Sequence, residues 1–167
     1  MHSIRSERPD DAPAIHVVTR EAFASAEHAS GTEPLIVDAL RTAGALTISL
    51  VAEEGGRIIG HVAASPVTID DAPSGYIGIG PLSVAPAHQR QGVGSALMRA
   101  LIGELRAAGA QGCVLLGEPA YYGRFGFEQA APLVLPGVPP AYFQSLVFTG
   151  PKPAGVVRYH AAFDVTA

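Results

Sequence analysis

Residues 84–95 read VAPAHQRQGVGS and join a strand-like segment to the longest helical pattern of the chain. Gly92 and Gly94 stand where this helix begins, so the backbone can come close to a bound group. The first N–H groups of a helix lack partners and carry the positive end of its dipole, and Arg90 adds a full charge. This helix start is therefore suited to an anion such as a pyrophosphate.

The segment just upstream, residues 76–84, has an interrupted strand pattern. Its apolar residues keep one parity up to Ile79 and the other parity from Leu82 onward, and the change falls at Gly80-Pro81. A strand cannot change face without an extra residue, so we expect a β-bulge there. Because Pro81 has no N–H, the ladder also loses one bond, and we expect free backbone groups that a ligand can pair with.

The rest of the chain continues an α/β pattern. Strands are expected at residues 3–7, 47–53, 57–65, 76–84, 113–116, 142–148 and 156–163. Helices are expected from Asp10, from Thr32 to Gly44 and over residues 92–108, with a short turn or helix at 118–125. The strand, helix and strand of residues 76–116 favour a right-handed crossover.

Composition limits the classes of function. The 167 residues suit one domain, residues 1–167, and 48% of them are apolar. A net charge of −4 without a basic run argues against nucleic acid as a partner. The sequence has no signal-peptide pattern and no apolar run long enough for a bilayer, so we expect no membrane partner and a cytoplasmic protein. The single cysteine, Cys113, excludes an intrachain disulfide and is expected to be a buried, inert thiol.

The glycine-containing loop also has other interpretations. A Rossmann fingerprint needs a glycine or alanine where Leu97 stands, although Glu118 follows the next strand as a ribose ligand would. A Walker A loop needs Gly-Lys-Ser/Thr, which the chain lacks. Two glycines alone also fit a helix start that binds nothing.

A wider set of motifs resembles the GNAT superfamily of N-acetyltransferases. Residues 89–94, QRQGVG, match its acyl-CoA motif Gln/Arg-x-x-Gly-x-Gly/Ala, and Tyr122 before Gly126-Phe127 matches a second signature. The resemblance covers most of residues 3–127. It implies a mixed, mostly antiparallel sheet of six to seven strands, with helices on both faces and a β-bulge in the fourth strand.

The resemblance also implies a ligand and roles for particular residues. The ligand is acetyl-CoA as cosubstrate, with no metal. The backbone of Leu82, Ser83 and Val84 would pair with the pantetheine arm and polarise the acetyl carbonyl. The pyrophosphate would lie against the loop and helix start, namely Gln89, Arg90, Gln91, Gly92, Val93, Gly94 and Ser95. Tyr122 would protonate the departing thiolate.

The base that deprotonates the amine is left open by the sequence. Glu118 ends the central strand, where ligands gather in α/β sheets, and His61, His28 or a water molecule are alternatives. Tyr121 could replace Tyr122 as the acid, or both could simply pack with the nearby phenylalanines.

The sequence thus predicts transfer of an acetyl group from acetyl-CoA to a primary amine of a small molecule or peptide, by direct attack on the thioester. A non-catalytic acyl-CoA-binding or regulatory module is the alternative, and a Rossmann-like nucleotide-binding protein is a third hypothesis. A homodimer is compatible with the sequence, which identifies no interface.

Overall fold

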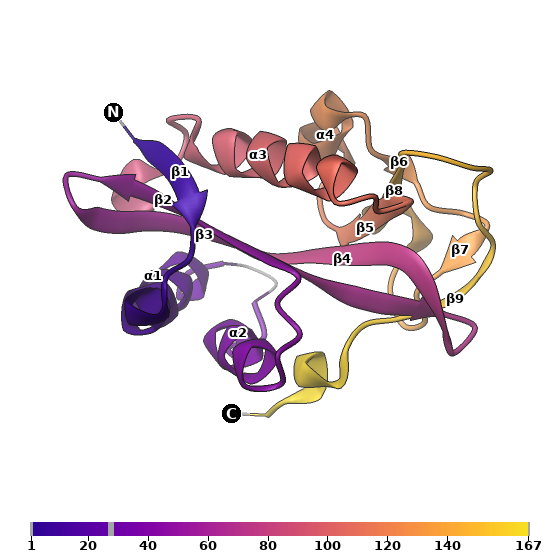
Figure 1. Cartoon of the computed structure of the whole chain (residues 1–167), viewed down its shortest axis with the longest axis horizontal. Helices are drawn as coiled ribbons and strands as arrows, with labels where there is room; N and C mark the ends of the chain where they lie inside the picture. The colour runs from indigo at the N-terminus through magenta and orange to yellow at the C-terminus, as the bar shows by residue number, and fades with distance from the viewer. Residues whose placement is uncertain (1, 27–28, 167) are drawn as a thin grey trace.

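The architecture is a three-layer sandwich, seen in a computed structural model that describes residues 2–26 and 29–166. A central sheet carries α3 (Val93–Ala107) on one face and α1 (Ala12–Phe23) and α2 (Glu33–Thr42) on the other, as Figure 1 shows. The fourth helix, α4 (Pro119–Tyr122), is a single turn beyond the central strand. The expected helices on both faces are therefore present.

Among the described residues the sheet is mostly antiparallel and has nine strands. Its main order is β1-β2-β3-β4-β5-β8-β6, while β9 pairs with β3 and β7 pairs with β9. The strands are β1 (Ser3–Ser6), β2 (Ile48–Glu54), β3 (Arg57–Ile69), β4 (Ala72–Val84), β5 (Gly112–Leu116), β6 (Glu128–Gln129), β7 (Leu133–Val134), β8 (Phe143–Val147) and β9 (Gly155–Arg158). The expected six to seven strands become nine because β6 and β7 have two residues each, too few to show an alternating pattern.

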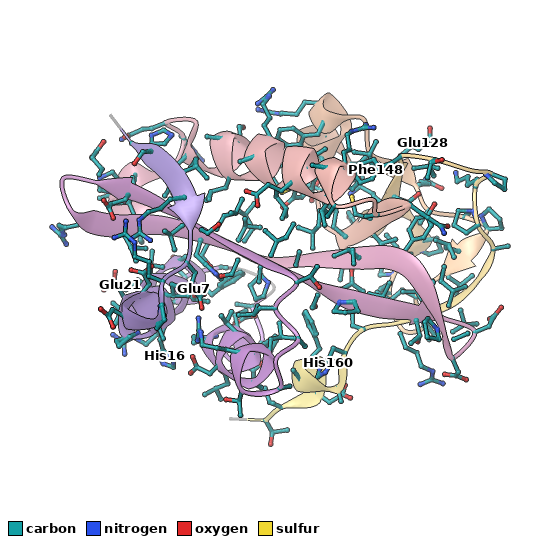
Figure 2. All side chains as sticks on the ribbon, viewed as in Figure 1. Glu7, His16, Glu21, Glu128, Phe148 and His160 are labelled. Carbon is teal, nitrogen blue, oxygen red and sulfur yellow. The ribbon has the colours of Figure 1, made fainter. Side chains whose placement is uncertain are left out.

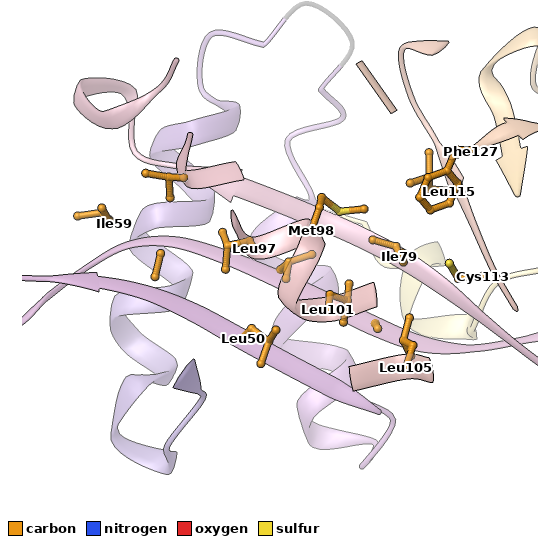
Figure 3. Close-up of a cluster of buried hydrophobic side chains, with 14 residues drawn as sticks. Leu50, Ile59, Ile79, Leu97, Met98, Leu101, Leu105, Cys113, Leu115 and Phe127 are labelled. Atoms are coloured by element: carbon orange, nitrogen blue, oxygen red, sulfur yellow. The ribbon is translucent and has the colours of Figure 1, made fainter. Parts of the chain in front are cut away.

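The main core lies between α3 and the sheet (Figure 3). The predicted helical stripe of Leu97, Leu101 and Leu105 is completely buried there, so its periodicity was a valid signal for the helix. Cys113 of β5 belongs to the same core, and burial raises the pKa of its thiol to about 12. The thiol therefore stays protonated and is a poor nucleophile.

Two further features complete the fold. The last expected strand, 156–163, ends early at Arg158, and a 3-10 helix, Ala161–Asp164, follows it. His160 caps this helix, because its Nδ1 accepts a hydrogen bond from the Ala162 N–H at 2.9 Å.

In the part of the chain that the structure describes, no helix is both long enough and apolar enough to cross a membrane.

Candidate functional site

The pairing of β3 with β4 shifts register at the predicted position. Val62 lies opposite Leu82, but Ala64 lies opposite Ile79, so β4 advances three residues while β3 advances two. The extra residue of β4 falls at Gly80-Pro81. As a result Ile79 and Leu82 both face the α3 core despite their opposite parity.

Beyond this irregularity β4 separates from β5. The two strands pair in parallel only from Tyr76 to Gly78 on β4, although β4 continues to Val84 and β5 to Leu116. An opening therefore separates their carboxyl ends.

Backbone groups of β4 point into this opening at alternate residues. The Ala85 N–H donates to the Ile59 carbonyl at 2.8 Å, which continues the β3–β4 ladder. Because hydrogen-bonded pairs alternate along an antiparallel ladder, the backbone of Ser83 bonds to His61. The backbone groups of Leu82 and Val84 point the other way, toward the opening. Of the three residues expected to offer their backbone to a ligand, Ser83 is thus turned toward β3.

The loop from β4 to α3 adopts backbone conformations that only some residues tolerate. Gly92 is the N-cap of α3 with φ +84°, and Arg90 has φ +63°. The Ala96 N–H donates to the Gly92 carbonyl at 3.0 Å and closes the first helical turn. The N–H groups of residues 93–95 precede that bond, so they form the anion-binding end of the helix.

A pocket of about 560 Å³ joins the β4 edge to this helix start. Seven of the ten predicted ligand-binding residues line it: Leu82, Val84, Gln89, Arg90, Gly92, Gly94 and Ser95. Arg90 and Arg124 are the charged residues in its described lining, which contains no carboxylate. The pocket therefore suits a polyanion with an elongated apolar arm. A larger hollow, about 940 Å³, lies between α1 and the β2–β3 turn and contains none of these seven residues.

The other three predicted residues lie beside the pocket. Ser83 and Val93 are buried, with exposed fractions of 1% and 2%. Gln91 is exposed, and its side chain donates to the Ala87 carbonyl at 3.3 Å.

The two adjacent tyrosines of α4 occupy different surroundings. Tyr121 lines the pocket, with its hydroxyl 3.3 Å from the Ser95 hydroxyl and its ring beneath the Arg124 guanidinium, 4.5 Å from centroid to carbon. Tyr122 packs over Gly117 at the end of β5, where an added Cβ would overlap its ring. Burial raises the pKa of Tyr122 to about 12. The aromatic cluster expected as an alternative exists, since Tyr122 also packs against Phe127 at 6.2 Å.

Neither Glu118 nor His61 lines the pocket. Glu118 is exposed at the end of β5, and its carbonyl accepts the N–H groups of Tyr121 and Tyr122, both at 3.1 Å. His61 is completely buried, and burial lowers its pKa to about 4. His28 lies outside the described residues. Within residues 2–26 and 29–166, no three His, Cys, Asp or Glu side chains gather as a metal site.

Comparison with known proteins identifies the family. A model of the acetyltransferase (GNAT) domain matches residues 46–129. YhbS, an uncharacterized N-acetyltransferase of Escherichia coli K12, is 40% identical over 129 residues, which are 77% of this chain and 74% of YhbS. The chain belongs to the GNAT acetyltransferase family.

Solved structures of similar GNAT proteins contain the expected ligand. A GNAT acetyltransferase from Brucella melitensis in complex with acetyl-CoA is 51% identical, with a TM-score of 0.89 over 98% of this chain and 99% of that one. The YhbS structure in complex with CoA is 35% identical, with a TM-score of 0.90 over 99% and 93% of the two chains.

In this GNAT chain the sequence motifs missed two parts of the pocket wall. One is Arg124, which lies inside the second family signature, between Tyr122 and Gly126-Phe127, in the 3-10 turn that follows α4. The other is the end of α1, where Ala22, Phe23 and Ala26 close the pocket opposite β4. The aromatic-plus-cation pair of Tyr121 and Arg124, three residues apart, was the available signal for the first. The wall at the end of α1 depends on a contact between distant segments, so the sequence gives no signal for it.

Proposed function

We propose that the whole chain is one N-acetyltransferase domain, which transfers an acetyl group from acetyl-CoA to a primary amine of a small molecule or peptide. The observation that carries this proposal is the continuity of the pocket. It runs from the outward-facing backbone of Leu82 and Val84 to the helix start at Gly92 and Gly94. Its size and two arginines suit CoA, and similar chains have been solved with acetyl-CoA and with CoA.

The backbone of β4 would hold the reactive arm of the ligand. An extended pantetheine chain can pair with the groups that Leu82 and Val84 turn toward the β4–β5 opening. A fixed N–H there would stabilise the oxyanion that forms when the amine attacks the thioester carbonyl, and such donors contribute strongly to acyl transfer. The pyrophosphate would then lie on the N–H groups at the start of α3, beside Arg90.

Proton transfers complete the proposed reaction. Tyr122 keeps its phenolic proton at neutral pH, and this proton would pass to the CoA sulfur as the C–S bond breaks. Tyr121 is the second candidate, since its hydroxyl lies on the pocket wall. The amine loses its own proton to Glu118, to water or to the relay described below.

The direct test combines binding with turnover. Acetyl-CoA should raise the melting temperature of the protein, because a ligand of the native state stabilises it. The protein should then release CoA when it is mixed with members of a panel of primary amines. Binding without CoA release from any amine would favour the non-catalytic acyl-CoA-binding module instead. No stabilisation by acetyl-CoA would contradict both.

A further inference from the structure

A row of polar side chains crosses the sheet beneath α1 and α2. Glu7 follows β1, Ser49 lies on β2, His61 on β3 and Ser83 on β4. The Ser49 hydroxyl donates to Glu7 Oε1 at 2.5 Å and lies 2.8 Å from His61 Nε2. Arg41 of α2 donates to both oxygens of Glu7, at 2.8 and 2.9 Å. Figure 2 shows Glu7 beside these two helices.

The hydrogen positions in this row follow from counting protons. Burial opposes the charge on Glu7, but the bonds from Arg41 and Ser49 lower its pKa, so the carboxylate is ionised and only accepts. The single hydroxyl hydrogen of Ser49 is then used on Glu7, and Ser49 must accept from His61. His61 therefore carries its hydrogen on Nε2, and its Nδ1 is a bare acceptor.

This acceptor has no protein partner although it is buried. His61 Nδ1 and the Ser83 hydroxyl both lack a hydrogen bond among the described residues, and the two side chains are 0% and 1% exposed. The residues are cross-strand neighbours on one face, with Cα atoms about 5.5 Å apart. Unpaired buried polar groups of this kind are usually joined by an ordered water. Ser83 stands between Leu82 and Val84, whose backbone faces the pocket.

Burial keeps the imidazole of His61 neutral at pH 7. The charged groups that act on its pKa are Glu7, which raises it, and Arg41, which lowers it, while burial dominates. β2 and β4 present the hydroxyls of Ser49 and Ser83. The buried residues of α1 are Ile15, Val18 and Thr19, and those of α2 are Pro34, Ile36, Val37 and Leu40. None of these ionises, so Glu7 is the anion placed to balance a proton on His61.

We propose that Glu7, Ser49 and His61 form a relay that accepts the proton lost by the amine during acetylation. The inference rests on the proposed acetyltransferase function. When an ammonium group is acetylated, an N–C bond forms and the C–S bond breaks. Tyr122 gives its proton to the CoA sulfur, and one N–H proton of the amine restores the phenol. A second N–H bond breaks, and its proton reaches Nδ1 through the water beside Ser83. The resulting imidazolium is held by Glu7 through Ser49, and the proton returns to solvent after the products leave.

Rates as a function of pH test the relay in the full-length protein, with the amine that the wild-type acetylates fastest. His61→Gln keeps the donor to Ser49 and removes the basic atom, so kcat should fall about 100-fold at pH 7. Ser49→Ala should lower kcat about 10-fold. The KM for acetyl-CoA should not change. The loss of kcat in both variants should become smaller above pH 9, because the solvent then takes the proton from the amine. A purely structural defect would lower kcat equally at all pH values.

Ser145→Ala is the control, because Ser145 on β8 is as buried as Ser83, its hydroxyl likewise has no partner among the described residues, and it lies outside the row. It should keep the wild-type rate at every pH. Wild-type kcat in His61→Gln, or a loss that is equal at all pH values, overturns the relay.

The position of the imidazole hydrogen gives a readout that needs no turnover. In protein labelled with ¹⁵N-histidine, NMR should show His61 with hydrogen on Nε2 and a bare Nδ1. Hydrogen on Nδ1 overturns the relay even in an active enzyme. A wild-type protein that binds acetyl-CoA but acetylates no amine overturns the proposed function instead, and the NMR result then still decides the geometry of the row.

Discussion

Replacing Gly94 by alanine should raise the stability of the protein and weaken its binding of acetyl-CoA. Gly94 lies in the first turn of α3, with ordinary helical backbone. Glycine in a helix costs up to about 1 kcal/mol relative to alanine, which corresponds to roughly 2–4 °C in Tm for a chain of this size. The new Cβ would lie 3.1 Å from the Tyr121 hydroxyl and 3.6 Å from Val84 Cγ2. The hydroxyl is the far end of a movable side chain, so little of the gain should be lost.

The same methyl group would stand where the proposed phosphate approaches the helix. Gly94 lines the pocket, and a hydrogen bond between an N–H and a charged oxygen contributes about 1.5–3 kcal/mol. Loss of one such bond weakens binding about 10- to 100-fold, because 1.4 kcal/mol corresponds to a factor of ten.

Calorimetric titration with acetyl-CoA measures the loss, and thermal unfolding without ligand measures the gain. Gly103→Ala is the matched control: Gly103 is on the same helix, is exposed, and a Cβ there would meet nothing within 4 Å. This control should gain similar stability and keep the wild-type Kd. If Gly94→Ala also keeps the wild-type Kd, the phosphates do not lie on this helix start and the proposed binding mode is wrong.

Three other variants test separate steps. Tyr122→Phe should lower kcat with little change in the Kd of acetyl-CoA, measured by initial rates of CoA release; an unchanged rate would remove Tyr122 from the mechanism. Because bonding to Arg41 and Ser49 lowers the pKa of Glu7, its contribution to stability is full above the unfolded pKa of about 4.5 and is lost as pH falls through the lower folded value. Glu7→Gln should therefore flatten the acid limb of the urea-unfolding free energy, and an equally steep limb would contradict the assignment. Leu101→Ala, at a completely buried position, should lower the unfolding free energy by about 2–5 kcal/mol with an unchanged circular dichroism spectrum, whereas a loss below about 1 kcal/mol would mean that the core collapses around it.

Patterns within short stretches of sequence were sufficient to predict those parts of the site that one short stretch forms by itself. The parity change around Gly80-Pro81 predicted where the β3–β4 register shifts, because alternation along one strand records which face each residue takes. The leucine spacing of α3 predicted that helix for the same reason. The direction of the Ser83 backbone could not be predicted from the sequence. It depends on which residue pairs between β3 and β4 are hydrogen-bonded, and the register of β3 decides this.

Contacts between distant segments explain the remaining differences. Glu118 does lie at the end of β5, as its position after an apolar run predicted, but it is exposed and does not line the pocket. His61 is on a strand, as expected, yet it is buried beneath α1 and α2 because its parity on β3 places it away from α3. The wall formed by the end of α1 comes from residues about sixty positions before the loop that it faces, and no local spacing records such a contact.

The positions of the two tyrosines favour different ends of one ligand. Tyr121 contacts Ser95 and approaches Gly94, so its hydroxyl lies at the start of α3, where the phosphates would bind. Tyr122 covers Gly117 at the end of β5, which borders the opening where β4 turns the backbone of Leu82 and Val84 outward. The thioester must lie at the opposite end of CoA from the phosphates. A proton donor for the sulfur is therefore needed at the β5 end, and this favours Tyr122 as the acid and Tyr121 as a residue that positions the phosphate end.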